Sequence, residues 1–102
     1  MNDSILINIY TKIQRNHTKF LANKIGGEMV MMNMETGDFI TLNNVGTEIW
    51  NLTELPITVK ELIGKLLTVY DLTEEKCINE TIPFLQNSLS ENIFIFHNDI
   101  IG

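Results

Sequence analysis

The residues best suited to chemistry in this chain are one cysteine and two histidines. Cys77 lies in the second half of the sequence, whereas His17 and His97 lie near its two ends. A nucleophilic cysteine needs a histidine base beside it, and a metal site needs ligands at spacings such as C-x-x-C or H-x-x-x-H. Neither spacing occurs in the sequence. We therefore expect no catalytic site, metal or cofactor, and we interpret Cys77 as a small apolar residue at the margin of the core.

The composition fits one globular domain and limits its partners. The chain has 102 residues, of which 44% are hydrophobic and 20% charged, and its formal net charge is −6. Seven basic residues against thirteen acidic ones would repel nucleic-acid phosphates and anionic lipids. The single cysteine cannot form an internal disulfide, and the apolar run at residues 5–10 is too short for a signal peptide or a membrane span. We expect a cytoplasmic protein with no nucleic-acid or membrane partner.

Three short strands are predicted before any helix, at residues 19–25, 28–34 and 39–42. Gly26-Gly27 separates the first two, and a turn containing Gly37 separates the second from the third. Short loops of this kind predict an antiparallel meander. Residues 1–18 fit a helical stripe and strand alternation equally well. We expect them to form an extended or loosely packed arm.

Two helices are predicted after the meander. Asn43 or Asn44 is a suitable N-cap for the first, in which apolar residues recur at spacings of four and three. The segment Thr58 to Glu61 has the T-x-x-E pattern of a capping box, which predicts the start of the second helix.

A third helix and a closing strand complete the predicted order. Thr73 caps this helix, and Pro83 within it predicts a kink. Its predicted core stripe is Ile78, Ile82, Leu85 and Leu89. A neighbouring, smaller and more polar stripe is Cys77, Thr81, Phe84 and Ser88. With a terminal strand at residues 93–96, the sequence predicts an α+β fold, winged helix-turn-helix-like, with a three-stranded antiparallel N-terminal meander, three helices and a short terminal strand.

Two motifs in this order carry a family resemblance. The first is L-N-x-x-G-x-x-I-W after a glycine turn and a short strand, here Leu42, Asn43, Gly46, Ile49 and Trp50. The second is a capped helix beginning T-V-x-E-L at residues 58–62 and ending near the Y-D pair at residues 70–71. Together they resemble the PqqD-like family, whose domain is called the RiPP recognition element. The resemblance covers residues 20–96, and it looks closest to the discrete proteins of lasso-peptide pathways. It divides the chain into an arm (1–18), a PqqD-like winged-helix peptide-binding domain (19–98) and a tail (99–102).

The resemblance implies peptide binding rather than catalysis. Members of this family hold the leader of a ribosomally synthesised precursor peptide, which adds as an antiparallel strand beside the third strand and packs against the third helix. They then present it to a modifying enzyme such as a peptidase, a cyclase or a radical enzyme. The residues implied for backbone pairing are Asp38, Phe39, Ile40, Thr41 and Leu42. The residues implied for the side-chain wall are Cys77, Thr81, Phe84 and Ser88.

Several alternatives remain open at the level of sequence. The strand at residues 39–42 could pair with the terminal strand or with the arm, and Phe84 could be a peripheral core residue. The chain could be a monomer, or a homodimer formed by strand exchange or edge pairing. A winged-helix DNA-binding regulator is disfavoured, because the third helix region carries four glutamates against Lys76. An assembly adaptor that binds a protein partner is a further alternative.

Overall fold

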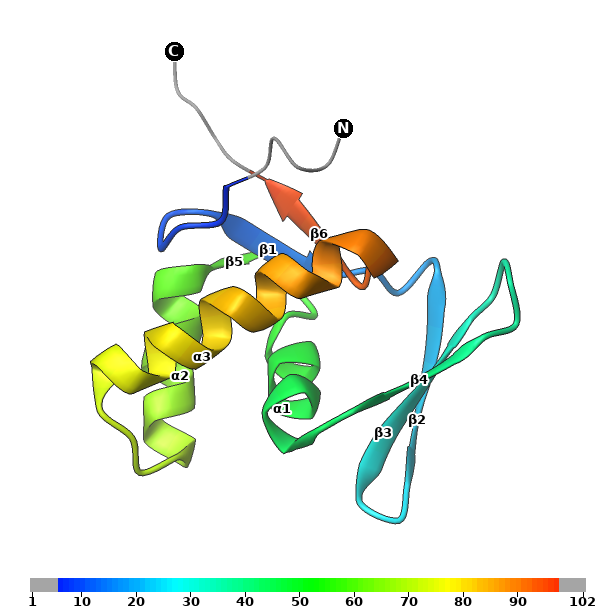
Figure 1. Cartoon of the computed structure of the whole chain (residues 1–102), viewed down its shortest axis with the longest axis horizontal. Helices are drawn as coiled ribbons and strands as arrows, with labels where there is room; N and C mark the ends of the chain where they lie inside the picture. The colour runs from blue at the N-terminus through cyan, green and yellow to red at the C-terminus, as the bar shows by residue number, and fades with distance from the viewer. Residues whose placement is uncertain (1–5, 98–102) are drawn as a thin grey trace.

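The computed structural model describes residues 6–97 and shows two small sheets flanking three α-helices (Figure 1). One antiparallel sheet has the order β5-β1-β6, formed by Ile57–Thr58, Lys12–Arg15 and Phe94–His97. The other has the order β2-β3-β4, formed by Phe20–Ile25, Glu28–Asn33 and Phe39–Leu42. The helices are α1 (Asn44–Leu52), α2 (Val59–Val69) and α3 (Glu74–Asn87), and the 3-10 turn η2 (Ser88–Glu91) follows α3. The mixed α and β composition expected from the sequence is confirmed.

The predicted meander is present as the sheet β2-β3-β4. β2 pairs with β3 and β3 with β4, both in antiparallel register. Gly26, Gly27 and Gly37 have positive φ angles at the two turns, a backbone conformation that glycine adopts without steric cost. Met29 and Met31 of β3 are buried, and so is Leu42 of β4. One face of this sheet therefore packs on the helices.

Of the two forms expected for the arm, extended or loosely packed, Lys12–Arg15 adopts the extended one and is not loosely packed. These residues form β1, the central strand of the other sheet, between β5 and β6. Ile13 is fully buried, with an exposed fraction of 0%. Burial of this side chain and pairing on both edges hold the segment in place. The first five residues of the arm and the tail at 99–102 lie outside the described residues.

The predicted helix starts are confirmed by their caps. The side chain of Asn43 accepts a hydrogen bond from the Gly46 N–H at 2.8 Å, and Thr73 caps α3. Thr58 and Glu61 form the capping box of α2, in which each residue's side chain bonds the other's backbone N–H. The backbone N–H and the hydroxyl of Thr58 both donate to the Glu61 carboxylate, and these two bonds lower the pKa of that carboxyl because they favour its charged form.

An aromatic cluster joins the helices to the sheet β5-β1-β6. Trp50 of α1 and Phe84 of α3 both pack against Phe94 of β6, with ring centroids 6.0 and 6.1 Å apart. The Arg15 guanidinium lies 5.6 Å from the centre of the Trp50 ring. The strand predicted at the end of the chain thus packs on the helical core and pairs with β1, not with the meander. Between residues 6 and 97, no helix has the length and apolarity needed to span a membrane.

Candidate functional site

The strand β4 has one unpaired edge. It pairs with β3 on one side, and within residues 6–97 no strand pairs with its other side. Of the sequence alternatives for this edge, the terminal strand and residues 6–18 of the arm do not pair with it, because β6 pairs with β1 in the other sheet. The edge also lacks the lysine or proline that usually protects such strands. It is therefore open for pairing with an added strand.

The register decides which backbone groups point out of this edge. The Asn33 N–H donates to the Asp38 carbonyl at 2.8 Å, so these opposed residues form a hydrogen-bonded pair. Such pairs alternate along an antiparallel ladder with pairs whose backbone groups face away. Ile40 and Leu42 therefore use their N–H and C=O groups toward β3, whereas Phe39 and Thr41 direct theirs outward. The outward groups of two residues are free to bond another strand.

Asp38 differs from the rest of the predicted edge. It lies in the turn before β4, its N–H donates to the Thr36 hydroxyl at 3.2 Å, and its carbonyl accepts from Asn33. Because both of its backbone groups are already bonded, Asp38 is not available for backbone pairing. This corrects the prediction for that residue.

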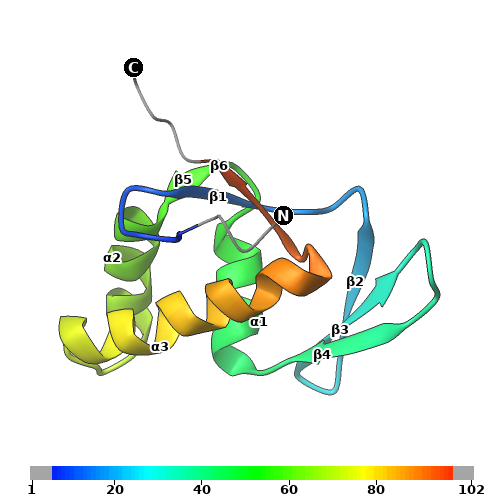
Figure 2. The same ribbon diagram turned by 45° about the horizontal axis from the view of Figure 1, so that its top comes forward.

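The junction between β4 and α1 fixes the strand rigidly to the helices. α1 begins at Asn44, one residue after the cap, so there is no loop between strand and helix. The Thr47 hydroxyl donates back to the Leu42 carbonyl at 3.4 Å. Ile49 and Trp50 are buried one turn further on. Figure 2 shows β4 running directly from the start of α1 out into the sheet, while α3 crosses in front of α1.

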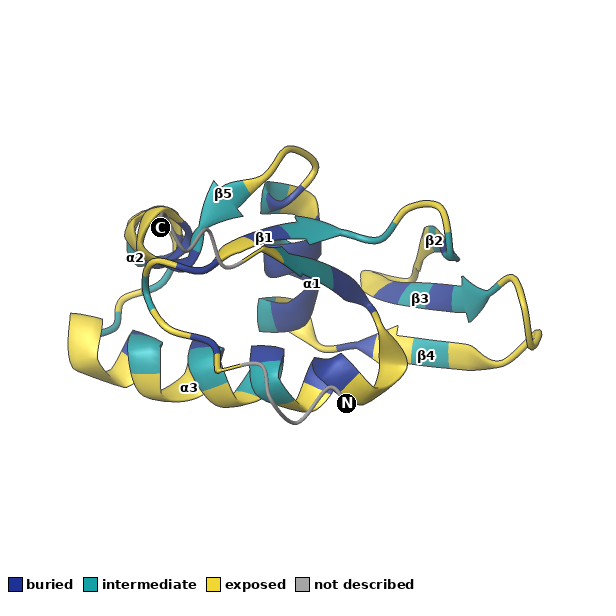
Figure 3. Cartoon of the chain, turned by 90° about the horizontal axis from the view of Figure 1, so that it is seen from above, coloured by how far each residue is buried: buried dark blue, intermediate teal, exposed yellow. Residues whose placement is uncertain are grey.

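The structure confirms Leu85 and Leu89 of the predicted core stripe as buried, but it turns the smaller stripe toward the core as well. The predicted wall residues Cys77, Thr81 and Ser88 have exposed fractions of only 2%, 1% and 5%. Ile78 and Ile82, expected in the core, are only half-buried. Figure 3 shows the resulting division of α3 into a buried side and an exposed side. Because buried side chains offer no surface to a ligand, the prediction of Cys77, Thr81 and Ser88 as direct contacts is corrected.

The burial of this stripe has a local explanation. The Ser88 hydroxyl bonds the Leu85 carbonyl at 2.7 Å, and the Cys77 sulfur lies 3.9 Å from the Thr81 hydroxyl. Small polar side chains satisfied within their own helix can face the core and allow close packing. Leu85 belongs to the same face and is fully buried.

Phe84 is the predicted wall residue that stays half-buried. Its ring lies over the start of α1, where a Cβ added at Gly46 would be 3.0 Å from the Phe84 ring carbon Cζ. The Phe84 ring therefore packs directly on Gly46, which leaves no room for a side chain there. This role of Gly46 was not predicted from the sequence. The signal was present, since Gly46 belongs to the motif that follows β4. Glu80 and Asn87, at spacings of four and three from Phe84, extend the same flank of α3 and are exposed.

The residues considered first for catalysis do not form a site. Cys77 is buried, whereas His17 and His97 are exposed on separate segments. Within the described part of the chain, no group of histidine, cysteine or carboxylate side chains is arranged to hold a metal ion. What the structure does bring together is the open edge of β4, the cap at Asn43 and the Phe84 ring.

Comparisons with known proteins show a shared fold and a family. A solved structure described as TbiB1 in complex with the TbiA(beta) leader peptide superposes with a TM-score of 0.72 at 20% identity, over 84% of this chain and 99% of that chain. At this identity the likeness shows a shared fold. The comparison with curated proteins gave no match. The family model for coenzyme PQQ synthesis protein D (PqqD) matches residues 28–93, more than half of the chain. The chain therefore belongs to the PqqD family.

Proposed function

We propose that this protein binds the leader segment of a ribosomally synthesised precursor peptide as an added strand on β4. The open edge, with the outward N–H and C=O groups of Phe39 and Thr41, carries the proposal. Membership of the PqqD family supports it, and so does the fold shared with TbiB1, whose structure contains a leader peptide. The role is binding, because a leader held in this way is recognised and not chemically changed.

Strand pairing alone would give weak binding. Each backbone hydrogen bond contributes about 0.5–1.5 kcal/mol net, whereas micromolar affinity corresponds to about −8 kcal/mol. Burial of one apolar leader side chain adds about 1.5–3 kcal/mol, and ordering of the leader opposes binding by about 2–5 kcal/mol. Side-chain contacts must therefore supplement the edge.

The side-chain contacts that we propose differ from those predicted from sequence. On an added strand, every second side chain lies on the helix-facing side, beside the half-buried Ile40. The side of α3 that lies next to the β4–α1 junction carries Phe84, Glu80 and Asn87. Phe84 supplies apolar surface to the leader, and the two polar residues supply hydrogen-bonding groups at the rim.

The same proposal extends to the enzyme partner, the pathway, the cellular location and the type of fold. The bound leader is presented to a modifying enzyme, such as a peptidase, a cyclase or a radical enzyme, and a lasso-peptide pathway is the proposed setting. Precursor synthesis on ribosomes makes the cytoplasm the proposed location. The winged-helix-like arrangement is the proposed frame, with α3 beside the peptide instead of in a DNA groove.

A backbone scan of the leader tests the proposal directly. The probe is a synthetic leader peptide of a candidate precursor, titrated calorimetrically against the full chain. In a series with one N-methylated amide each, affinity should fall at two positions separated by one residue, because only Phe39 and Thr41 present outward carbonyls. A scrambled leader is the control. Equal affinity for the leader and its scrambled version, or an unperiodic scan, would contradict binding at this edge.

A further inference from the structure

Gly46 is a glycine inside a helix, and the backbone does not require glycine at this position. It lies in the first turn of α1, it is buried, and it is not among the glycines that have a positive φ angle. A glycine in an ordinary helical conformation destabilises a helix relative to alanine. The reason for glycine here therefore lies outside the backbone of α1.

The contacts of an added side chain supply that reason. A Cβ built at Gly46 lies 3.0 Å from the Cζ and 3.2 Å from the Cε1 of the Phe84 ring. It also lies 3.2 Å from the Oδ1 of Asn43, the oxygen that caps α1. Contacts this short require the neighbour to move by a few tenths of an ångström. By contrast, a Cβ at Gly64, an exposed glycine of α2, meets no neighbouring heavy atom within 4 Å.

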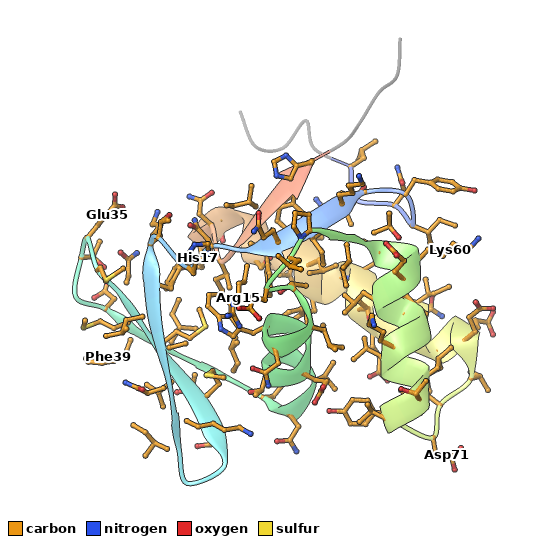
Figure 4. All side chains as sticks on the ribbon, turned by 180° about the vertical axis from the view of Figure 1, so that it is seen from behind. Arg15, His17, Glu35, Phe39, Lys60 and Asp71 are labelled. Atoms are coloured by element: carbon orange, nitrogen blue, oxygen red, sulfur yellow. The ribbon has the colours of Figure 1, made fainter. Side chains whose placement is uncertain are left out.

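The Phe84 ring can yield only toward the leader site. Behind it lies Phe94, in edge contact with ring centroids 6.1 Å apart, and Phe94 packs in turn against Trp50. Phe94 and Trp50 are each only 3% exposed. The Arg15 guanidinium covers the Trp50 ring at 5.6 Å, and Figure 4 shows Arg15 beside α1. Because this layer is closely packed, the half-buried Phe84 ring would move outward, toward the proposed leader strand.

From these contacts we infer that Gly46 is a specificity-determining residue of the leader site, which acts through the position of the Phe84 ring. Without a side chain at Gly46, the ring lies against the first turn of α1. This position leaves depth beside the β4–α1 junction for a large apolar side chain of the leader. The inference rests on the proposed function. Gly46 is a positioning residue, because it is buried beneath Phe84 and affects the leader only through that ring.

The leader register identifies the side chain that enters this site. Leader positions opposite Phe39 and Thr41 are the ones sensitive to N-methylation, and their side chains lie on the outer face. The positions that alternate with them lie opposite Ile40 and Leu42, so their side chains face the helices. Alanine replacement at each helix-facing position of the synthetic leader finds the one with the largest loss of affinity. We define the size preference as the ratio of affinities for the intact leader and this truncated leader.

Gly46→Ala in the full chain tests the inference by titration calorimetry with these two peptides. In the wild type, truncation should lower the affinity about tenfold. Gly46→Ala should lower the affinity for the intact leader about threefold to tenfold, because the displaced ring meets the large side chain. The truncated leader should lose less than about twofold, so the size preference falls.

Two further variants separate positioning from a general loss of structure. In the Phe84→Ala background, Gly46→Ala should change the leader affinity by less than about twofold, because no ring remains to be displaced. Gly64→Ala is the matched control. It makes the same substitution in a helix where open space surrounds the glycine, and it should leave the affinity and the size preference unchanged.

The outcomes distinguish the inference from the proposed function. If Gly46→Ala keeps the wild-type affinity and size preference, the inference is wrong although the proposed function stands. If Gly46→Ala weakens both peptides by the same factor, or acts equally without the Phe84 ring, its role is structural only and the inference is overturned. If the wild type binds no leader, the proposed function is rejected and the inference with it. A reduced size preference that depends on Phe84 would support the inference.

Discussion

At the scale of residues, the site depends on which atoms of β4 point outward. The Asn33–Asp38 hydrogen bond fixes the alternation along the ladder. It places Phe39 and Thr41 on the free edge and gives Ile40 an inward role. Two neighbouring residues of one short strand therefore have opposite functions, and substitution of each should have a different consequence.

Thr41→Pro should weaken leader binding without unfolding the chain. Proline removes an N–H that has no partner within the described sheet, and proline is tolerated at such edge positions. We expect a loss of leader affinity of about tenfold or more, since one hydrogen bond is lost and the ring crowds the incoming strand. Titration calorimetry measures it.

Two further variants frame this result. Ile40→Pro removes an N–H that bonds β3 and should strongly lower the urea midpoint, and Thr41→Val should behave as wild type in both measurements. Full leader affinity in Thr41→Pro would show that the edge is not used.

Phe84→Ala should weaken leader binding about tenfold, because it removes the apolar surface beside the β4–α1 junction. The variant should lose less stability than the value of about 3–5 kcal/mol that is typical when a fully buried phenylalanine is replaced by alanine. Ile82→Ala is the matched control: Ile82 is also half-buried but lies two residues away, on the opposite flank of α3. Equal affinity losses in both variants would remove Phe84 from the site.

At the scale of elements, caps decide where the helices begin and thereby how β4 is held. α1 starts at its cap directly after β4, and α2 starts at the capping box of Thr58 and Glu61. β5 ends at the same Thr58, so this cap also joins α2 to the sheet β5-β1-β6.

Thr58→Ala should lower the free energy of unfolding by about 1 kcal/mol, the usual cost of losing an N-cap hydroxyl. The hydroxyl accepts the Glu61 N–H at 3.1 Å, and alanine leaves that donor to water. Urea unfolding at neutral pH measures the loss. Thr68→Ala, at an exposed position near the end of α2, is the control and should change stability less.

Glu61→Gln should make the free energy of unfolding depend less on pH in the acid range. The folded-state pKa of Glu61 lies below its ordinary value of 4.5, so its contribution is present above pH 4.5 and is lost as the pH falls through the lowered pKa. The difference between wild-type and variant unfolding free energies should therefore shrink as the pH falls from 5 through the lowered pKa of Glu61. A difference independent of pH would contradict the role of the charged carboxylate.

At the scale of the whole molecule, the sheet β2-β3-β4 projects beside the helical part and leaves the edge of β4 open. The described chain is flat, with extents of 36 × 35 × 21 Å. A homodimer through the open edge would occupy the same backbone groups as the leader, so leader binding and edge pairing should compete.

The net charge makes a prediction for the winged-helix alternative. With a net charge of −6, and glutamates at the start of α3, the chain should not retain duplex DNA even at low salt, where phosphate contacts are strongest. An electrophoretic shift with duplex DNA, measured beside leader binding at the same salt, checks this. If the chain retains duplex DNA and this retention weakens steeply with salt, the result would support a DNA-binding regulator.

The sequence by itself determined the local structure. The glycine turns, the caps at Asn43, Thr58 and Thr73, and the strand Phe39–Leu42 all depend on neighbours within a few residues, and the structure confirms them. The motif around Gly46 also indicated the family. The match over residues 28–93 shows that the chain belongs to it.

Only the tertiary structure decided which surfaces remain open. The arm segment Lys12–Arg15 and the terminal strand are distant in sequence, and their pairing left β4 with a free edge. The facing of α3 was decided by packing: periodicity favoured Ile78 and Ile82 for the core, yet the smaller side chains of Cys77 and Thr81 pack there. Both outcomes depend on contacts between remote segments, and the period of a single helix or strand cannot encode which partner covers it.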